Sequence, residues 1–226
     1  MLDIIKYPLP SYTKGRTRQV SYGVIHYVSA KNVTKYKNDP YNIEGCLEIF
    51  KNDGPKYKFS CHYLIARNGQ TYQMIDIKNT AWHAGKSVVA YPHFEQDINP
   101  SSIGIELVGM LDDSFTNEQY QSLAELSVYI EEQVITQGLG IIKHWTGHSN
   151  ISGEIAVKLG IKEANVMKKD PGELFDWQVF YREKARVILT EEIKISCVSE
   201  ITKNVLSSIT TKECITLLIQ KLFKKK

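Results

Sequence analysis

The chain contains no long run of apolar residues. Nowhere among its 226 residues do about 18 apolar side chains follow one another, the length that a membrane-spanning helix needs. The first residues, Met1 to Lys6, show neither the apolar segment nor the small-residue cleavage site of a secretory signal. We therefore expect a protein without a transmembrane segment, located in the cytoplasm, with the periplasm as the alternative.

Cysteine is scarce, and its spacing excludes the common cysteine motifs. None of the four cysteines, Cys46, Cys61, Cys197 and Cys214, forms a CxxC pair. Buried free thiols in a reducing compartment fit this spacing better than a disulfide framework or a Cys₄ zinc site. The formal net charge of +3 is also small. It permits attraction to an anionic cell-wall polymer and gives no reason to expect nucleic acid as a partner.

The order of the predicted elements defines the fold class. A hydrophobic content of 42% and a charged content of 23% are typical of a soluble globular protein. Apolar alternation, helical spacing and turn residues predict the order β, α, β-hairpin, β, α, β, α, which indicates an α/β fold with a mixed central sheet flanked by helices. The predicted segments are strand 22–28, helix 43–50 ended by Gly54-Pro55, hairpin strands 59–66 and 70–77, strand 103–108, helix 117–137 behind a capping box at Thr116, strand 141–146 and helix 174–189.

The composition also predicts three parts. Residues 1–20 are polar and read as an extended surface arm, and residues 21–189 contain the sheet and its helices. From Thr190 to Lys226, apolar residues recur at helical spacing, which indicates one or two short amphipathic helices. We expect this C-terminal tail to pack against its own domain, with a homodimer contact as the second possibility.

Two of the predicted strands each carry one ionisable side chain. His26 lies in strand 22–28, and Glu106 lies in strand 103–108 on the face opposite its apolar neighbours. A histidine in such a strand is either a satisfied core residue or a ligand. A buried carboxylate is costly, so Glu106 is either paired with a lysine or arginine or acts as a proton acceptor with a shifted pKa.

The stretch from His144 to Gly172 presents side chains from bends. His148 follows a glycine, and Asp170 lies in an Asp-Pro-Gly turn. We predict that these two residues and His26 bind one Zn²⁺, since three protein ligands leave an open position of the kind that catalytic zinc sites have. His144 is the rejected candidate, because its neighbours favour a strand that places it deeper in the sheet. The simpler alternative for Asp170 is a turn that needs no metal.

Three further residues each have a functional and a simpler interpretation. Lys168, two positions before Asp170, is placed where oxyanion charge would develop, although such lysines are usually only solvated. Trp82 and His83 lie in a loop of small residues, where they either line a cleft or simply pack.

Six short segments resemble those of a known family and occur in the order found there. The family is the zinc-dependent N-acetylmuramoyl-L-alanine amidases of the type 2 amidase and peptidoglycan-recognition-protein fold. The six segments extend over roughly residues 20–182. The segments are Val24-Ile25-His26-Tyr27, Ser60-Cys61-His62-Tyr63-Leu64-Ile65, Ala81-Trp82-His83-Ala84-Gly85, Ser102-Ile103-Gly104-Ile105-Glu106-Leu107, Thr146-Gly147-His148 and Lys168-Lys169-Asp170-Pro171-Gly172.

The resemblance implies one zinc ion at one end of a surface groove and assigns roles to individual residues. It implies that His26, His148 and Asp170 are the ligands, that Glu106 is the catalytic carboxylate and that Lys168 stabilises the tetrahedral intermediate. The substrate it implies is the amide between N-acetylmuramic acid and L-alanine, with sugar and peptide in a groove around Tyr63, Trp82 and His83.

From this resemblance we expect an enzyme that acts on peptidoglycan or (anhydro)muropeptides in cell-wall turnover and recycling. A secreted or phage-type lytic amidase and a non-catalytic peptidoglycan-binding module are the alternatives. The sequence departs from the family in a longer insert between His148 and Asp170, and in Cys61, where some relatives have tyrosine.

Overall fold

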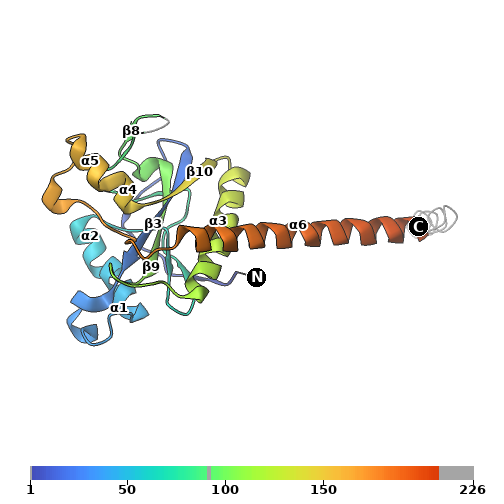
Figure 1. Cartoon of the computed structure of the whole chain (residues 1–226), viewed down its shortest axis with the longest axis horizontal. Helices are drawn as coiled ribbons and strands as arrows, with labels where there is room; N and C mark the ends of the chain where they lie inside the picture. The colour runs from blue at the N-terminus through green and yellow to red at the C-terminus, as the bar shows by residue number, and fades with distance from the viewer. Residues whose placement is uncertain (1, 91–92, 209–226) are drawn as a thin grey trace, which may run out of the picture. The chain divides into compact units, whose positions relative to one another are not determined.

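A six-stranded mixed sheet forms the centre of the fold (Figure 1). The computed structural model describes residues 2–90 and 93–208. The strands lie in the order β1-β5-β4-β9-β3-β10, and β5 runs antiparallel to β4 while β4, β9, β3 and β10 are parallel to one another. Their bounds are β1 Ile4–Lys6, β5 Thr71–Gln73, β4 Tyr63–Ile65, β9 Ser102–Val108, β3 Val20–Val28 and β10 Gly140–Gly147.

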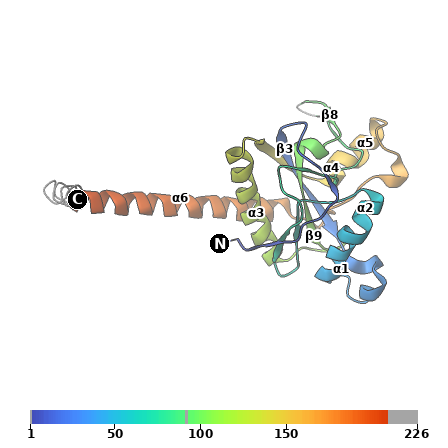
Figure 2. The ribbon, with the colours of Figure 1, turned by 180° about the vertical axis from the view of Figure 1, so that it is seen from behind.

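Helices cover both faces of this sheet, as the two opposite views show (Figures 1 and 2). The α-helices of the described residues are α1 Ile43–Glu48, α2 Gly54–Tyr57, α3 Asn117–Thr136, α4 His148–Ser152, α5 Glu154–Lys158 and α6 Trp177–Ser208, and of α6 only the part up to Lys184 belongs to the unit that contains the sheet. Two short strand pairs, β2 Tyr12–Thr13 with β6 Thr80–Ala81 and β7 Val88–Val89 with β8 Glu95–Gln96, lie outside the main sheet. The predicted α/β fold with a mixed sheet and flanking helices is confirmed.

The apolar side chains of β3 and β9 alternate between two cores. Ile25, Ile105 and Leu107 pack with the inner side of α3 and with Phe180 at the start of α6. Val108 lies in a second core on the other face, with Cys46 and Phe50 from the α1 region. Because side chains alternate along a strand, His26 and Glu106 point away from the α3 core.

The capping box predicted at the start of α3 is confirmed. The Thr116 side chain accepts a hydrogen bond from the Gln119 backbone N–H, and the Gln119 side chain accepts one from the Thr116 backbone N–H. These bonds satisfy two N–H groups that the first helical turn leaves unpaired. Buried Leu123, Leu126 and Ile130 then hold α3 on the sheet.

Two local predictions differ from the structure. Gly54-Pro55 does not end the helical segment: Ile49–Asp53 forms a π-helical turn and Gly54 begins α2, since proline fits the first turn of a helix. The N-terminal segment is not only a surface arm, because β1 pairs with β5 and Arg16 donates to the backbone oxygens of Ile77, Pro100 and Ser102.

The C-terminal helix is longer than predicted. The chain divides into two compact units, Met1–Lys184 and Ala185–Lys226, and α6 continues unbroken through Thr190, where the composition predicted a boundary. The tail beyond Ser208 lies outside the described residues, and its packing and the homodimer contact remain predictions. No helix within residues 2–90 and 93–208 has the length and apolar content to cross a membrane.

Two of the cysteines can be compared with their prediction. Cys46 and Cys61 are buried free thiols, as expected. The side chain of Cys197 and all of Cys214 lie outside what the structure describes.

Candidate metal centre and active site

Neighbouring parallel strands bring the first two candidate residues together. In the β3–β9 pairing, His26 is the register partner of Glu106, so both side chains leave the sheet on the same face. On the other side of β3, Gly147 at the end of β10 pairs with Ile25. His148 therefore begins α4 beside the strand that carries His26.

The loop that carries Asp170 is tied to α4 by its backbone. The Ser149 N–H donates to the Asp170 oxygen at 2.8 Å, and the Lys168 N–H donates to the Ser152 oxygen at 3.0 Å. Gly147 makes this approach possible, because a Cβ at that position would lie 2.7 Å from Cδ of Pro171. The bend at Gly147 thus brings residues 22 positions apart in the chain into contact.

Three potential ligand atoms meet at one point. Nδ1 of His26 and Nδ1 of His148 are 3.0 Å apart, and each lies 3.0 Å from Oδ2 of Asp170. Both histidines are buried, and the three residues form the group that can hold a metal ion within the described part of the chain.

The hydrogen bond behind His148 tests whether a metal ion fits this group. Nε2 of His148 lies 3.1 Å from the Ala84 carbonyl oxygen, which can only accept, so Nε2 carries the proton of the neutral ring. The lone pair on Nδ1 then faces the Asp170 carboxylate. Ligand atoms at the usual zinc distances in a tetrahedron are about 3.3 Å apart, close to the spacing seen here. A divalent cation therefore fits the three residues.

Burial and mutual contact keep the ligands in the forms that a metal ion needs. Burial, together with the neighbouring His148, lowers the pKa of His26 to about 4. Burial raises the pKa of Asp170, but its close contacts with His148 and His26 outweigh burial and hold that pKa below its ordinary value. At neutral pH, His26 is thus unprotonated and Asp170 ionised.

Glu106 has the opposite environment. Burial, and the nearby Asp170 charge, raise the pKa of Glu106 well above its ordinary value, while Lys168 lowers it. Its Oε2 is buried and has no hydrogen-bond partner, and within the described residues no lysine or arginine lies at ion-pair distance. The structural alternative of a salt bridge therefore has no support there, whereas a buried carboxyl group with a raised pKa is suited to proton transfer.

A cavity of about 260 Å³ opens onto this cluster. The residues that line it come from β3, β9, the helical segment after α1, the segment before β4, the start of α4 and the loops around Trp82 and Asp170. They are His26, Tyr27, Phe50, Phe59, Ser60, Trp82, His83, Glu106, His148, Lys168 and Asp170. The structure thus brings together the candidate ligands, Glu106, Lys168, Trp82 and His83.

Tyr63 and His144 lie elsewhere. Tyr63 is 1% exposed and packs in the core under α3, so it does not line this cavity, contrary to the expected groove around it. His144 is exposed on β10, where its ring stacks on Tyr22 with centroids 6.3 Å apart. Tyr27, Phe50 and Phe59 were not predicted to line the site, because apolar side chains at strand or helix spacing look like core residues in the sequence.

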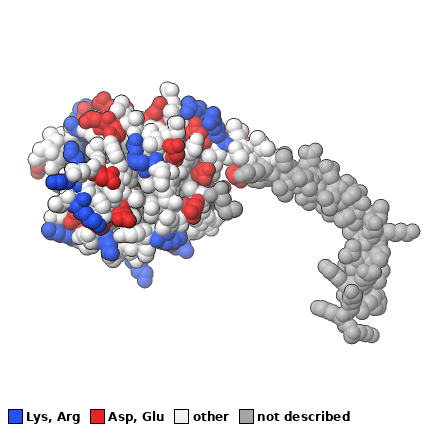
Figure 3. Space-filling model, turned by 90° about the horizontal axis from the view of Figure 1, so that it is seen from below, with Lys and Arg blue, Asp and Glu red and all other residues white. Residues whose placement is uncertain are grey.

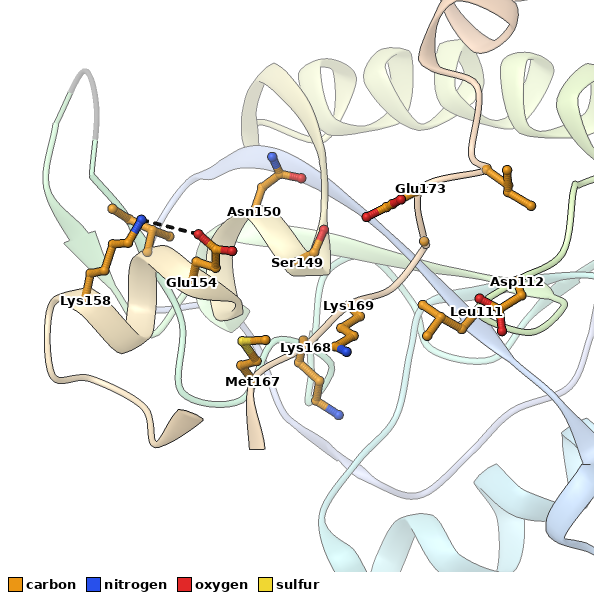
Figure 4. Close-up of a pocket in the computed structure, with 13 residues that line it drawn as sticks. Leu111, Asp112, Ser149, Asn150, Glu154, Lys158, Met167, Lys168, Lys169 and Glu173 are labelled. Atoms are coloured by element: carbon orange, nitrogen blue, oxygen red, sulfur yellow. Dashed lines mark hydrogen bonds and ion pairs between the residues drawn. The ribbon is translucent and has the colours of Figure 1, made fainter. Parts of the chain in front are cut away.

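A larger groove of about 1020 Å³ shares Lys168 with the cavity (Figure 4). Ser149, Asn150 and Glu154 reach it from α4 and α5, in the insert between His148 and Asp170, while Leu111 and Asp112 lie across from them. The insert therefore forms one side of this groove. On the face seen in Figure 3, acidic and basic side chains of the first unit are interspersed.

A mixed sheet that presents two imidazoles, one carboxylate and an adjacent buried carboxyl group in a cavity provides the kind of donor set that open, catalytic metal sites use. The sequence pattern of the N-acetylmuramoyl-L-alanine amidases matches residues 16–173. The chain belongs to this family.

Individual relatives agree with this membership. The chain is 31% identical over 175 residues to the 1,6-anhydro-N-acetylmuramyl-L-alanine amidase AmpD of Haemophilus influenzae, covering 71% of the chain and 80% of the relative. It is 37% identical over 123 residues to AmpD of Citrobacter freundii, covering 54% of the chain but only 56% of that relative. A crystal structure of a selenomethionine derivative of AmpD matches with a TM-score of 0.60 at 28% identity, over 81% of the chain and 95% of that structure.

Proposed function

We propose that this protein hydrolyses the amide bond between N-acetylmuramic acid and the L-alanine of the stem peptide, with 1,6-anhydro-muropeptides as substrates. The observation that carries the proposal is the cluster of His26, His148 and Asp170 beside Glu106, whose buried Oε2 has no hydrogen-bond partner among the described residues. Family membership adds the bond type, and the names of the AmpD relatives point to the anhydro-muramyl group.

We propose one Zn²⁺ per chain, held by His26, His148 and Asp170. When bound, it supplies Lewis acidity for the amide carbonyl and lowers the pKa of water at its open position. Glu106 lines the same cavity, and there it accepts a proton from the attacking water and delivers it to the leaving nitrogen of L-alanine. The Lys168 ammonium group stabilises the negative charge that develops on the carbonyl oxygen.

The surroundings of the cluster provide room for both parts of the substrate. Trp82, Phe50 and Phe59 give the cavity apolar surface, and the larger groove beyond Lys168 has mixed polar and charged lining. We propose that sugar and stem peptide occupy these two spaces on either side of the scissile amide. A recycling role in the cytoplasm remains a prediction.

Product analysis tests this function directly. The zinc-loaded protein is incubated in parallel with a 1,6-anhydro-muramyl tetrapeptide and with intact peptidoglycan, and the products are identified by mass spectrometry. We expect free tetrapeptide and anhydro-muramic acid, formed faster than peptide is released from intact peptidoglycan. Faster release from intact peptidoglycan would favour a lytic amidase. Binding without any release would favour the non-catalytic module.

A further inference from the structure

His83 lies behind the cluster in a continuous line of hydrogen bonds. Its Nδ1 is 3.1 Å from Nε2 of His26, and its Nε2 is 3.0 Å from Oγ of Ser102. The Ser102 hydroxyl in turn donates to the Ile98 carbonyl oxygen at 2.7 Å. His26, His83 and Ser102 are all buried, so water does not compete for these bonds.

The carbonyl at the end of this line fixes the direction of every bond. A carbonyl oxygen only accepts, so it takes the single hydroxyl proton of Ser102. Ser102 must then accept from Nε2–H of His83, and the neutral His83 ring has its lone pair on Nδ1. That lone pair accepts from Nε2–H of His26. The remaining lone pair of His26 is therefore on Nδ1, the atom that faces Asp170.

The neutral form of His83 agrees with its contacts. Within the described residues its ring is hydrogen-bonded to His26 and Ser102 and to no carboxylate, so nothing there favours a buried positive charge. The ring of His83 packs directly against Gly104, where a Cβ would lie only 2.4 Å from Cγ of His83. Any larger residue at position 104 must displace the ring.

Ala84, the residue after His83, fixes the tautomer of His148, the other histidine ligand. The Ala84 carbonyl oxygen accepts from Nε2–H of His148, which leaves the lone pair of that ring on Nδ1. The Asn99 side-chain oxygen accepts from both backbone N–H groups of this pair, His83 at 2.9 Å and Ala84 at 2.7 Å. His83 and Ala84 thus accept hydrogen bonds from the rings of His26 and His148, and Asn99 fixes the backbone of His83 and Ala84.

We propose that the His83–Ala84 pair, oriented by Ser102 and Asn99, is a positioning element that fixes His26 and His148 in the tautomer with Nδ1 free for the metal ion. His83 thus acts through His26 and is not required to touch the substrate. This inference rests on the proposed metal site. Groups that orient ligands in this way typically change metal affinity by about 10- to 100-fold when they are removed.

Zinc affinity of three variants tests the inference. The affinity for Zn²⁺ alone is measured by competition with a chelator. His83→Leu removes the acceptor, and we expect binding about 10- to 100-fold weaker. His83→Asn returns an acceptor oxygen near the position of Nδ1, and we expect it to recover most of the loss. Ser102→Ala leaves His83 free to adopt either tautomer and is expected to weaken binding less than His83→Leu. Ser101→Ala is the matched control, since this neighbouring buried serine bonds to Glu95 and Ile98 and not to His83.

A second measurement reports the tautomer itself and needs no metal ion. In the metal-free protein labelled with ¹⁵N-histidine, long-range ¹H–¹⁵N NMR spectra distinguish a proton on Nε2 from one on Nδ1. We expect His26 in the Nε2–H form in the wild type, in His83→Asn and in Ser101→Ala. We expect a mixture of both tautomers in His83→Leu and Ser102→Ala. A change in packing alone would not move this signal.

The outcomes separate this inference from the proposed function. Wild-type protein that fails to bind zinc refutes the metal site, while the metal-free spectra still decide the direction of the hydrogen bonds. Wild-type zinc affinity and an unchanged His26 tautomer in His83→Leu would overturn the positioning role. If His83→Leu does not fold, Ser102→Ala decides: an unchanged tautomer there overturns the inference.

Discussion

Replacing Glu106 by glutamine is expected to change rate and stability in opposite directions. Glutamine has nearly the same size and shape but cannot accept a proton from water. In the structure, Oε2 of Glu106 is buried without a partner, so the substitution breaks no ion pair within the described residues. A residue kept for its structural contacts would show the reverse: little loss of rate and a loss of stability.

The size of the stability change follows from the pKa of Glu106, which burial and the Asp170 charge raise well above its ordinary value. In the unfolded chain a glutamate releases its proton near about pH 4.3. Between that pH and the higher pKa of the folded protein, the folded state binds more protons, so its stability falls as the pH rises. The loss is about 1.4 kcal/mol for each pH unit of that interval. Glu106→Gln removes this loss.

Two assays measure the two effects. Urea unfolding of the metal-free protein, with chelator present, gives the free energy of unfolding from pH 8 down to the lowest pH at which the transition remains cooperative. We expect Glu106→Gln to be more stable than wild type near pH 7, with the difference shrinking toward pH 4. Turnover of a muropeptide by the zinc-loaded variant is expected to fall by about 10²–10⁴, the usual contribution of a general base.

Glu125→Gln is the matched control, because Glu125 is an exposed glutamate on α3. It should change neither property, and both variants should bind one zinc ion. Near-normal turnover by Glu106→Gln would refute the proton-transfer role. A variant less stable than wild type at neutral pH would show that the buried carboxylate has a stabilising partner, contrary to the structure.

Three further substitutions or conditions test the rest of the site. His148→Ala should lose zinc while keeping its fold, as elemental analysis can show. The control His144→Ala changes an exposed residue of β10 and should keep the metal. Zinc retained by His148→Ala would contradict the ligand set. Lys168→Ala should bind zinc normally but turn over about 10²–10³ times more slowly, as when one oxyanion donor is lost, whereas Lys143→Ala on the exposed face of β10 should match wild type in the same assay. The pKa of His26 is lowered to about 4 by burial, and an unfolded histidine takes up its proton near about pH 6.5, so the unfolded state binds more protons between these values. The metal-free protein should therefore lose stability as the pH falls from about 6.5 to about 4, by up to about 1.4 kcal/mol per pH unit, and His26→Gln should flatten this slope in urea titrations.

The sequence by itself determined the elements that have a regular period or a specific end signal. The alternation in β9 placed Glu106 on the face opposite its apolar neighbours, the run in β3 placed His26 in a strand, and the structure has the two residues as register partners. The capping box at Thr116 marked the start of α3. The bends at His148 and Asp170 were visible as glycine and proline, since these residues restrict the backbone locally.

Tertiary structure alone decided where buried side chains of equal hydrophobicity point. All three residues of β4 are buried, because helices cover both faces of the sheet, so no polar alternation shows on which face Tyr63 lies. The same absence of contrast hid Phe50 and Phe59 as residues of the cavity. Gly54 began a helical turn because the preceding segment was already helical, an effect that its own local preference does not contain.

The surroundings of His83 could not be predicted from the sequence either. A histidine in a loop of small residues fits a substrate groove as well as it fits a buried support. Three residues that are 15 to 21 positions away in the chain make His83 a buried support. Ser102 is its hydrogen-bond partner, the Ile98 carbonyl oxygen accepts from Ser102, and Gly104 leaves room for the ring. Directional bonds between segments distant in sequence form only when the sheet and its loops have assembled, and they decide which nitrogen of His26 faces the metal site.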